Sequence, residues 1–365
     1  MKILRNYLIK EFCGPLILAV IALSFVFTLG YLVQIAYLVI NKGVDVLTVT
    51  KLFLLRIPSI LIYILPISTL VAILLSMGRL SSDNEIVTIR ACGINLVRLV
   101  TPLLTLGLLL SMLMVIFNDR IIPYAHFESR KTLIEVGVKN PAAALEPGVF
   151  INSFDKYILF IYAIDGNKLS NVRIYEPQGD DKPTRIIVAK RGEFLALPEK
   201  NIVKLKLMDG TADEPDPNDP RSFYKLNFKT YFMSLNFADI KDKDAIEKKP
   251  KDMTINELRA QIEKLKKEGI DDTPMIAEIN EKISLAFSSF VFILLGLPLA
   301  VITRRREKSI NFGIAFIIIG AYYLMLLGME ALSMQGYLDP SLAIWLPNIL
   351  FGSLGAYLTF RLCVY

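Results

Sequence analysis

The stretch that decides the fold lies at residues 57–78 and reads IPSILIYILPISTLVAILLSMG. It contains no Asp, Glu, Lys or Arg, and it is as long as the roughly 20 apolar residues that a helix needs to cross a bilayer. Five further stretches of this kind occur at residues 12–41, 99–118, 283–303, 309–329 and 340–360. A helix in a soluble core is rarely apolar on every face over such a length. The sequence therefore predicts a membrane helical bundle with six transmembrane helices.

Composition and charge narrow the class of protein further. Of the 365 residues, 53% are hydrophobic and the mean hydropathy is +0.48, which is too apolar for a soluble protein of this length. The net charge is +6, but the basic residues gather at the ends of the apolar stretches, so no nucleic-acid partner is expected. Three cysteines and one histidine indicate neither a disulfide framework nor a zinc site.

The loops between the spans predict the orientation of the chain, because cytoplasmic loops are enriched in Lys and Arg. Basic residues lie before the first span, after the second and after the fourth: Lys2, Arg5, Lys10, Arg79, Arg90, Arg98, Arg304, Arg305, Arg306 and Lys308. Both termini are therefore expected in the cytoplasm. Three parts follow: residues 1–118 with three spans, a periplasmic segment at 119–282, and residues 283–365 with the other three spans.

The periplasmic segment has short alternating runs in place of continuous apolar ones. VKLKL at 203–207 and YKLNFK at 224–229 have the period of two that is typical of strands. Further strands are expected at 157–164, 171–175 and 185–189, with turns at 165–166, 178–180 and 209–210 and an acidic, solvated loop at 211–220. The expected fold is an antiparallel sandwich or partly open barrel. Its apolar face forms either a closed core or a groove for acyl chains.

Polar helices are expected at residues 253–281, between the strands and the fourth span. Thr254 followed by Glu257 is a capping box that begins one helix, and Gly269 is suited to its end. These helices would connect the periplasmic segment to the second group of spans.

The loop between spans two and three reads RLSSDNEIVTIRACGINLVR at residues 79–98. Ser82 with Glu85 matches a capping box, Asp83 and Glu85 suit the positive start of a helix, and Gly93 suits its C′ position. The pattern predicts a short cytoplasmic helix at about residues 81–93. Glu85 has two candidate roles, as an intramolecular cap or as an ion-pair partner for another protein.

Three segments resemble the lipopolysaccharide export permeases of the LptF/LptG family. They are SDNEIVTIRACG at 82–93, ILPISTL at 64–70 and NPAAALEPGVF at 140–150. The resemblance implies a periplasmic β-jellyroll inserted between three spans and three spans. It further implies a second related six-span permease, a cytoplasmic ABC ATPase dimer and a periplasmic bridge β-jellyroll protein as partners. Between the paired permeases it implies a cavity that opens toward the outer leaflet.

The same resemblance assigns roles to individual residues. Glu85 would lie on the coupling helix that seats in the ATPase, together with Asp83, Arg90 and Gly93. Basic residues near the outer end of the first span would approach the phosphates of the lipid, and the residues near that place are Lys42, Lys51 and Arg56. A position where the family often has a basic residue reads VQI here, at 33–35. The alternative role of these three basic residues is interfacial anchoring by snorkelling.

The function expected on these grounds is the permease subunit of an ABC-type exporter, which extracts lipopolysaccharide from the inner membrane and passes it through the β-domain toward the outer membrane. The sequence has no P-loop motif and no paired catalytic groups, so no enzyme activity, cofactor or metal is expected and a partner must hydrolyse ATP. The spans lack ionisable residues, which disfavours a secondary transporter. A membrane-anchored assembly or sensor protein, whose β-domain binds a partner protein, remains the alternative.

Overall fold

The structure, a computed structural model, describes residues 2–40, 44–139, 148, 150–154, 157–165, 168–177, 184–197, 202–215, 223–235, 248–303 and 308–364. The chain divides into two compact units. The helical unit comprises Met1–Tyr31, Leu55–Phe127 and Lys248–Tyr365, and the second unit, which holds the strands, comprises Leu32–Leu54 and Glu128–Glu247.

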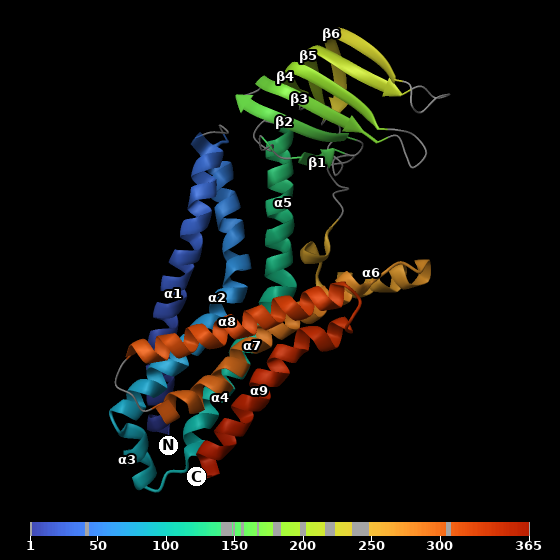
Figure 1. Cartoon of the computed structure of the whole chain (residues 1–365). Helices are drawn as coiled ribbons and strands as arrows, with labels where there is room; N and C mark the ends of the chain where they lie inside the picture. The colour runs from blue at the N-terminus through green and yellow to red at the C-terminus, as the bar shows by residue number, and fades with distance from the viewer. Residues whose placement is uncertain are drawn as a thin grey trace. The chain divides into compact units, whose positions relative to one another are not determined.

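Long helices account for most of the described chain (Figure 1). They are α1 (Lys2–Ile40), α2 (Val46–Ser82), α3 (Glu85–Ala91), α4 (Leu96–Ile116), α5 (Ile122–Lys139), α6 (Ile255–Glu268), α7 (Thr273–Thr303), α8 (Lys308–Met334) and α9 (Pro340–Val364). A π-helical turn at Phe117–Ile121 joins α4 to α5, and a 3₁₀ turn at Pro250–Asp252 precedes α6. Among the described residues, six helical segments are long and apolar enough to cross a membrane, which confirms the predicted number of spans. Three of them precede the strands along the chain and three follow.

Helix α6 begins and ends as its sequence predicts. The Thr254 hydroxyl accepts a hydrogen bond from the amide of Glu257, whose carboxylate accepts one from the amide of Thr254. Gly269 ends the helix with a φ of 68°, a left-handed conformation in which only glycine avoids a steric penalty. The capping box and the C-terminal glycine are both confirmed.

Helix α7 joins the second predicted polar helix and the fourth predicted span into one element. It starts at Thr273 rather than near residue 283. As a consequence, Glu278, Glu281 and Lys282 lie on the same continuous helix as the apolar span. Ionisable residues were expected to be absent from the span at 283–303, but the helix that contains this span carries them in its first turns.

Helix α7 is the central helix of its unit. In the most apolar 18-residue stretch of α7, 72% of the residues are buried, whereas 11% are buried in the corresponding stretch of α1. Helix α7 packs against both α4 and α9 (Figure 1). Glycines permit this close approach. A Cβ atom added to Gly107 of α4 would lie 2.8 Å from Ile293, and one added to Gly355 of α9 would lie 2.9 Å from the backbone nitrogen of Leu295. Small residues serve helix packing in this way in membranes, where lipid supplies no hydrophobic driving force between helices.

The second unit contains one antiparallel sheet of six described strands in the order β1-β2-β3-β4-β5-β6. The strands are β1 (Phe150–Phe154), β2 (Tyr157–Asp165), β3 (Lys168–Glu176), β4 (Arg185–Leu197), β5 (Ile202–Pro215) and β6 (Phe223–Leu235). Five of them contain the five predicted strand segments, whereas β1 was not predicted. Each strand pairs with its neighbour in sequence, so the described strands form a single meander and the jellyroll-like detail is not confirmed.

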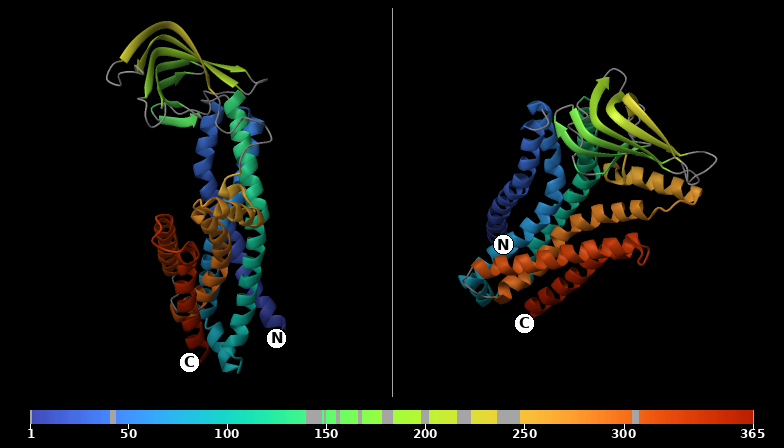
Figure 2. Two further views of the ribbon diagram at one scale, coloured as in Figure 1. Left: turned by 90° about the vertical axis from the view of Figure 1, so that its right-hand side faces the viewer. Right: turned by 45° about the horizontal axis from the view of Figure 1, so that its top comes forward.

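The sheet curls strongly (Figure 2), and a line of interrupted pairing crosses it. Asn171 of β3 and Asp209 of β5 have φ values of 51° and 54°, and neither appears in the otherwise regular pairing of its strand with the neighbours. Asn and Asp are the residues other than glycine that most readily adopt this left-handed conformation. Next to Asp209, a Cβ on Gly210 would lie 2.4 Å from the carbonyl oxygen of Val188. The predicted turn at 209–210 is therefore wrong, because these residues bend a continuous strand.

One face of the sheet is closed over its own apolar side chains. Leu159, Val172, Ile187, Leu205 and Leu207 each have an exposed fraction of 0%, and together they form the core of this unit. Of the two alternatives left open by the sequence, the described structure corresponds to the closed core. The predicted acidic loop is corrected in part, because its first residues up to Pro215 belong to β5, while 216–220 lie outside the described residues.

Candidate functional site

Helix α3 starts differently from the predicted capping box. Ser82 is the last residue of α2 and its hydroxyl donates to the carbonyl oxygen of Arg79 at 2.9 Å. The N-cap is instead Asn84, which has a φ of 58° and makes no side-chain capping bond. The capping box is wrong because α2 continues past its predicted end through Ser82, which leaves two residues for the turn into α3.

The other end of α3 agrees with the sequence. Gly93 has a φ of 75°, its amide donates to the carbonyl of Arg90 at 2.9 Å, and the amide of Ile94 donates to that of Ile89 at 3.3 Å. This is the Schellman arrangement, and it confirms Gly93 as the C′ residue. The next helix follows at once, because the Asn95 side chain caps α4 by accepting from the amide of Val97.

The carboxylate of Glu85 joins α3 to two long helices. Its Oε2 accepts a hydrogen bond from the Tyr7 hydroxyl of α1 at 2.7 Å, and its Oε1 lies 3.9 Å from Nη2 of Arg79 on α2. The same Nη2 donates to the Tyr7 hydroxyl at 3.0 Å, while Nε of Arg79 pairs with Glu11 of α1 at 2.9 Å. We call Tyr7, Glu11, Arg79 and Glu85 the α3 clamp. Glu85 thus does not cap its own helix, because its partners in this chain lie on α1 and α2. Its role as an ion-pair partner for another protein stays a prediction.

The two faces of α3 differ in exposure. Ile86 is 3% exposed and packs into the core of the helical unit, whereas Val87 is 48% exposed. Asp83 and Arg90 are exposed. The first turns of α1 and the last turns of α9 lie at the same end of the helical unit as α3 (Figures 1 and 2). Helix α3 therefore presents an exposed surface at the end of the helical unit where α1 begins and α9 ends.

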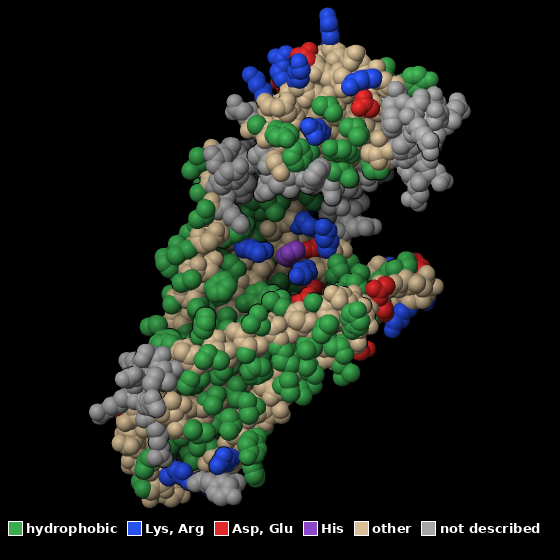
Figure 3. All heavy atoms as spheres, in the orientation of Figure 1, with side chains coloured by type: hydrophobic (Ala, Val, Ile, Leu, Met, Phe, Trp, Pro, Cys, Tyr) green, Lys and Arg blue, Asp and Glu red, His purple; other side chains and the backbone are tan. Residues whose placement is uncertain are grey.

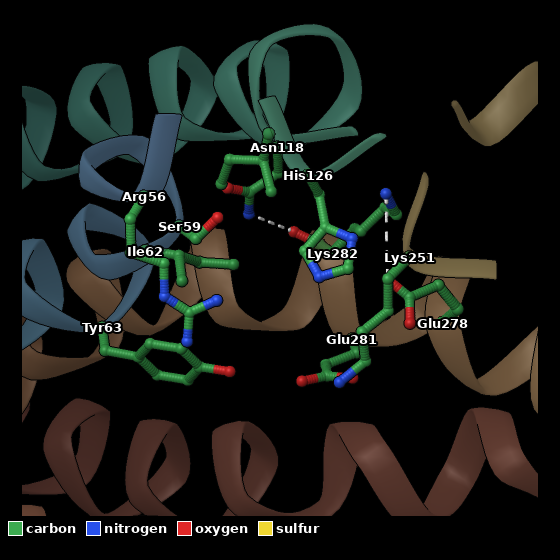
Figure 4. A pocket seen from close by; sticks show the side chains of 11 residues that line it. Arg56, Ser59, Ile62, Tyr63, Asn118, His126, Lys251, Glu278, Glu281 and Lys282 are labelled. Carbon is green, nitrogen blue, oxygen red and sulfur yellow. Dashed lines mark hydrogen bonds and ion pairs between the residues drawn. The ribbon is translucent and has the colours of Figure 1, made fainter. Parts of the chain in front are cut away.

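A polar pocket lies elsewhere in the helical unit (Figure 4), in a region where charged side chains gather on an otherwise largely hydrophobic surface (Figure 3). Helix α2, the segment from the π-helical turn to α5, the 3₁₀ turn and α7 all contribute to its lining. The lining residues are Arg56, Ser59, Ile62, Tyr63, Asn118, Ile122, His126, Lys251, Glu278, Glu281 and Lys282. Charged side chains from segments far apart in the sequence thus converge on one cavity.

Part of the pocket wall is an internal polar network. Lys282 is 5% exposed, and its ammonium donates to the carbonyl of Met253 at 2.9 Å and lies 3.8 Å from Glu278. Nδ1 of His126 lies 2.6 Å from the buried carboxylate of Asp252. These contacts attach the 3₁₀ turn to α5 and α7, so Lys282, Glu278 and His126 are occupied in holding the pocket together.

Three other charged groups face the pocket without a hydrogen bond or an ion pair within the described chain: Arg56, Lys251 and Glu281. The guanidinium of Arg56 lies over the ring of Tyr31, 5.8 Å from its centroid. A cation placed against an aromatic face keeps its hydrogen-bond donors available. The pocket can therefore present a guanidinium and an ammonium to an anionic group.

Comparison with known proteins identifies the family. The model described as lipopolysaccharide export system permease LptF/LptG matches residues 6–361. The chain belongs to this family. The resemblance of the three sequence segments is thereby confirmed, and the family is one of permeases for lipopolysaccharide transport.

Comparison with individual proteins supports the same family for this chain. Lipopolysaccharide export system permease protein LptF of Escherichia coli (strain K12) is 24% identical over 352 residues, which cover 96% of this chain and 92% of that protein. LptF of Shigella flexneri matches to the same extent. An uncharacterized protein of Rickettsia prowazekii (strain Madrid E) is 24% identical over 236 residues, 64% of each chain. Together with the six apolar helices, these matches indicate a multi-pass protein of the inner membrane.

The predicted substrate contacts of this family member fall in different places. Lys42 lies outside the described residues. Lys51 belongs to the second unit, where its ammonium pairs with Glu128 at 2.7 Å. Arg56 belongs to the helical unit and lines the pocket.

Sequence reasoning missed most residues of these sites, among them Tyr7, Glu11, Lys251 and Glu281. The only local signal was the spacing of Tyr7 and Glu11, which places both on one face of α1. The partners of Tyr7 are 72 and 78 positions away along the chain, at Arg79 and Glu85.

Proposed function

We propose that this chain is the permease subunit of an ABC-type exporter that extracts lipopolysaccharide from the inner membrane and passes it through its β-domain toward the outer membrane. The observation that carries the proposal is α3, a short helix tied by Glu85 to α1 and α2. A protrusion attached to two spans can transmit a rotation of an ATPase to the bundle, whereas a loosely connected one cannot. The energy would come from a cytoplasmic ABC ATPase dimer.

Coupling to that ATPase is assigned to Asp83, Glu85, Arg90 and Gly93. Asp83 and Arg90 are exposed and would face the partner. Gly93 terminates the helix, and Glu85 would hold it in position. A second related six-span permease and a periplasmic bridge β-jellyroll protein complete the proposed assembly, with the curled sheet as the jellyroll-like counterpart in this chain.

In the proposed topology both termini and α3 are cytoplasmic, residues 1–118 and 283–365 form the three-plus-three membrane part, and 119–282 are periplasmic. The native Cys92 beside α3 is exposed, which permits a direct test. In spheroplasts, a membrane-impermeant maleimide should label Cys introduced at the exposed Lys204 of β5 but should label Cys92 only after the membrane is opened. Labelling of both positions from the same side would contradict the proposal.

Binding of the lipid phosphates is assigned to Arg56, with Lys42 and Lys51 as further candidates. Support comes from the guanidinium of Arg56, which has no carboxylate partner in the described chain and shares a pocket with Lys251. Arg56→Gln should lower photo-crosslinking of lipopolysaccharide to this chain about fivefold, a loss typical of one charge-assisted contact. Unchanged crosslinking would leave Arg56 as an interfacial anchor.

Purification from native membranes tests the assembly as a whole. Affinity capture of this chain should bring along an ATPase and a second six-span protein, with vanadate-sensitive ATP hydrolysis in the eluate. Capture of the chain alone, or with a periplasmic protein but no ATPase, would instead favour the membrane-anchored assembly or sensor protein.

A further inference from the structure

The α3 clamp ties the short helix to the first span as well as to the second. Tyr7 and Glu11 lie on α1, Arg79 lies near the end of α2, and Glu85 opens α3. The four side chains are linked in a chain from Glu11 through Arg79 and Tyr7 to Glu85, at 2.9, 3.0 and 2.7 Å. Three helices thus share one polar cluster at their common end.

A helix of seven residues cannot keep its own position. Isolated helices this short are unstable in water, so the placement of α3 depends on its tertiary contacts. These contacts include the burial of Ile86, the turns at each end, and the clamp. The clamp supplies the polar contact between α3 and α1 in the described structure, the bond of Tyr7 to Glu85.

We infer that Tyr7 is a positioning residue for energy coupling, and that Glu85 acts through Tyr7 and Arg79 rather than through a direct contact with the ATPase. The inference rests on the proposed function. The Tyr7 hydroxyl donates to an ionised acceptor, a class of hydrogen bond stronger than a neutral one. When α3 is displaced by a partner, this bond carries the displacement to the first span, and Arg79 carries it to the second.

The direction of the Glu85 side chain supports this role. Its carboxylate is directed toward α1 and α2, while Val87 on α3 and Asp83 in the turn before α3 remain exposed. An ion pair of Glu85 with a partner would compete with Tyr7 and Arg79 for the same carboxylate. The outward surface of α3 is therefore available for docking while Glu85 stays in place.

A double-mutant cycle on the intact complex tests the inference. Tyr7→Phe removes only the hydroxyl, Glu85→Ala removes the acceptor, and Tyr124→Phe on α5 is the control, because Tyr124 is 67% exposed and has no partner in the described chain. The measured quantities are complex yield and the ATP hydrolysed per lipopolysaccharide extracted from proteoliposomes. Tyr7→Phe should raise the ratio of ATP to lipid about threefold to tenfold at unchanged yield, and the control should not change it.

The cycle distinguishes the inference from the proposed function. If Tyr7 and Glu85 act together, Tyr7→Phe adds little to Glu85→Ala, because coupled residues are not additive. A wild-type ratio for Tyr7→Phe, or full additivity of the two changes, would overturn the inference and leave the exporter intact. Failure of the unmodified chain to recover any ATPase would overturn the proposed function itself.

Discussion

At the scale of single residues, Lys282 shows how the helical unit accommodates a buried charge. Lys282 is 5% exposed, yet its ammonium donates to the carbonyl oxygen of Met253 and has the carboxylate of Glu278 nearby. A buried charge is strongly unfavourable unless it is paired and hydrogen-bonded. The contacts of Lys282 meet both conditions, and they also fix the 3₁₀ turn at the edge of the pocket.

Lys282→Met should therefore destabilise the protein by about 3 kcal/mol, because Glu278 would remain buried without its partner. Thermal unfolding of the purified protein in detergent would measure the loss. Lys264→Met is the matched control, since Lys264 is exposed on α6, and we expect its change to stay within about 0.5 kcal/mol. Equal stability of the two variants would show that the Lys282 contacts contribute nothing net.

At the scale of elements, the packing of α9 on α7 depends on one glycine. Gly355→Ala would place a Cβ 2.9 to 3.0 Å from the backbone of Leu294 and Leu295, and backbone cannot move aside as a flexible side chain can. We expect a loss of about 1–3 kcal/mol in the same unfolding measurement. Gly320→Ala on α8 meets nothing within 4 Å and should be neutral or slightly stabilising. A neutral Gly355→Ala would mean that the two helices separate without cost.

The elements themselves were largely predictable, but their ends and bends were not. Alternation located five strands because a period of two depends only on neighbouring residues. The pair Asp209-Gly210 was predicted to form a turn, since Asp-Gly has the same local preference in a turn and at a bend within a strand, where Asp209 has a positive φ. The capping box at Ser82 was wrong for a related reason: tertiary packing extended α2 over a residue that could equally begin a helix.

At the scale of the whole molecule, the closed sheet makes a prediction about transport. A photo-crosslinker at Leu205, which is fully buried in the apolar core of the sheet, can reach a lipid only if the sheet opens. Under the proposed function we expect capture of lipopolysaccharide there during ATP hydrolysis but not with a hydrolysis-deficient ATPase. The adjacent Lys204 points to the opposite, exposed face and should give several-fold less capture in either condition. Capture of protein alone at Leu205 under both conditions would identify the face as a permanent core.

The membrane-spanning character of this chain, the number of its spans and the presence of strands between them follow from residue order alone, because apolar length and alternation are properties of continuous segments. The partners of Glu85, the charged lining of the pocket and the closure of the sheet depend on folding. Tyr7 and Glu85 are 78 positions apart, and the lining of the pocket runs from Arg56 to Lys282. No local pattern records such distances, since which distant side chains meet is decided only when the helices pack.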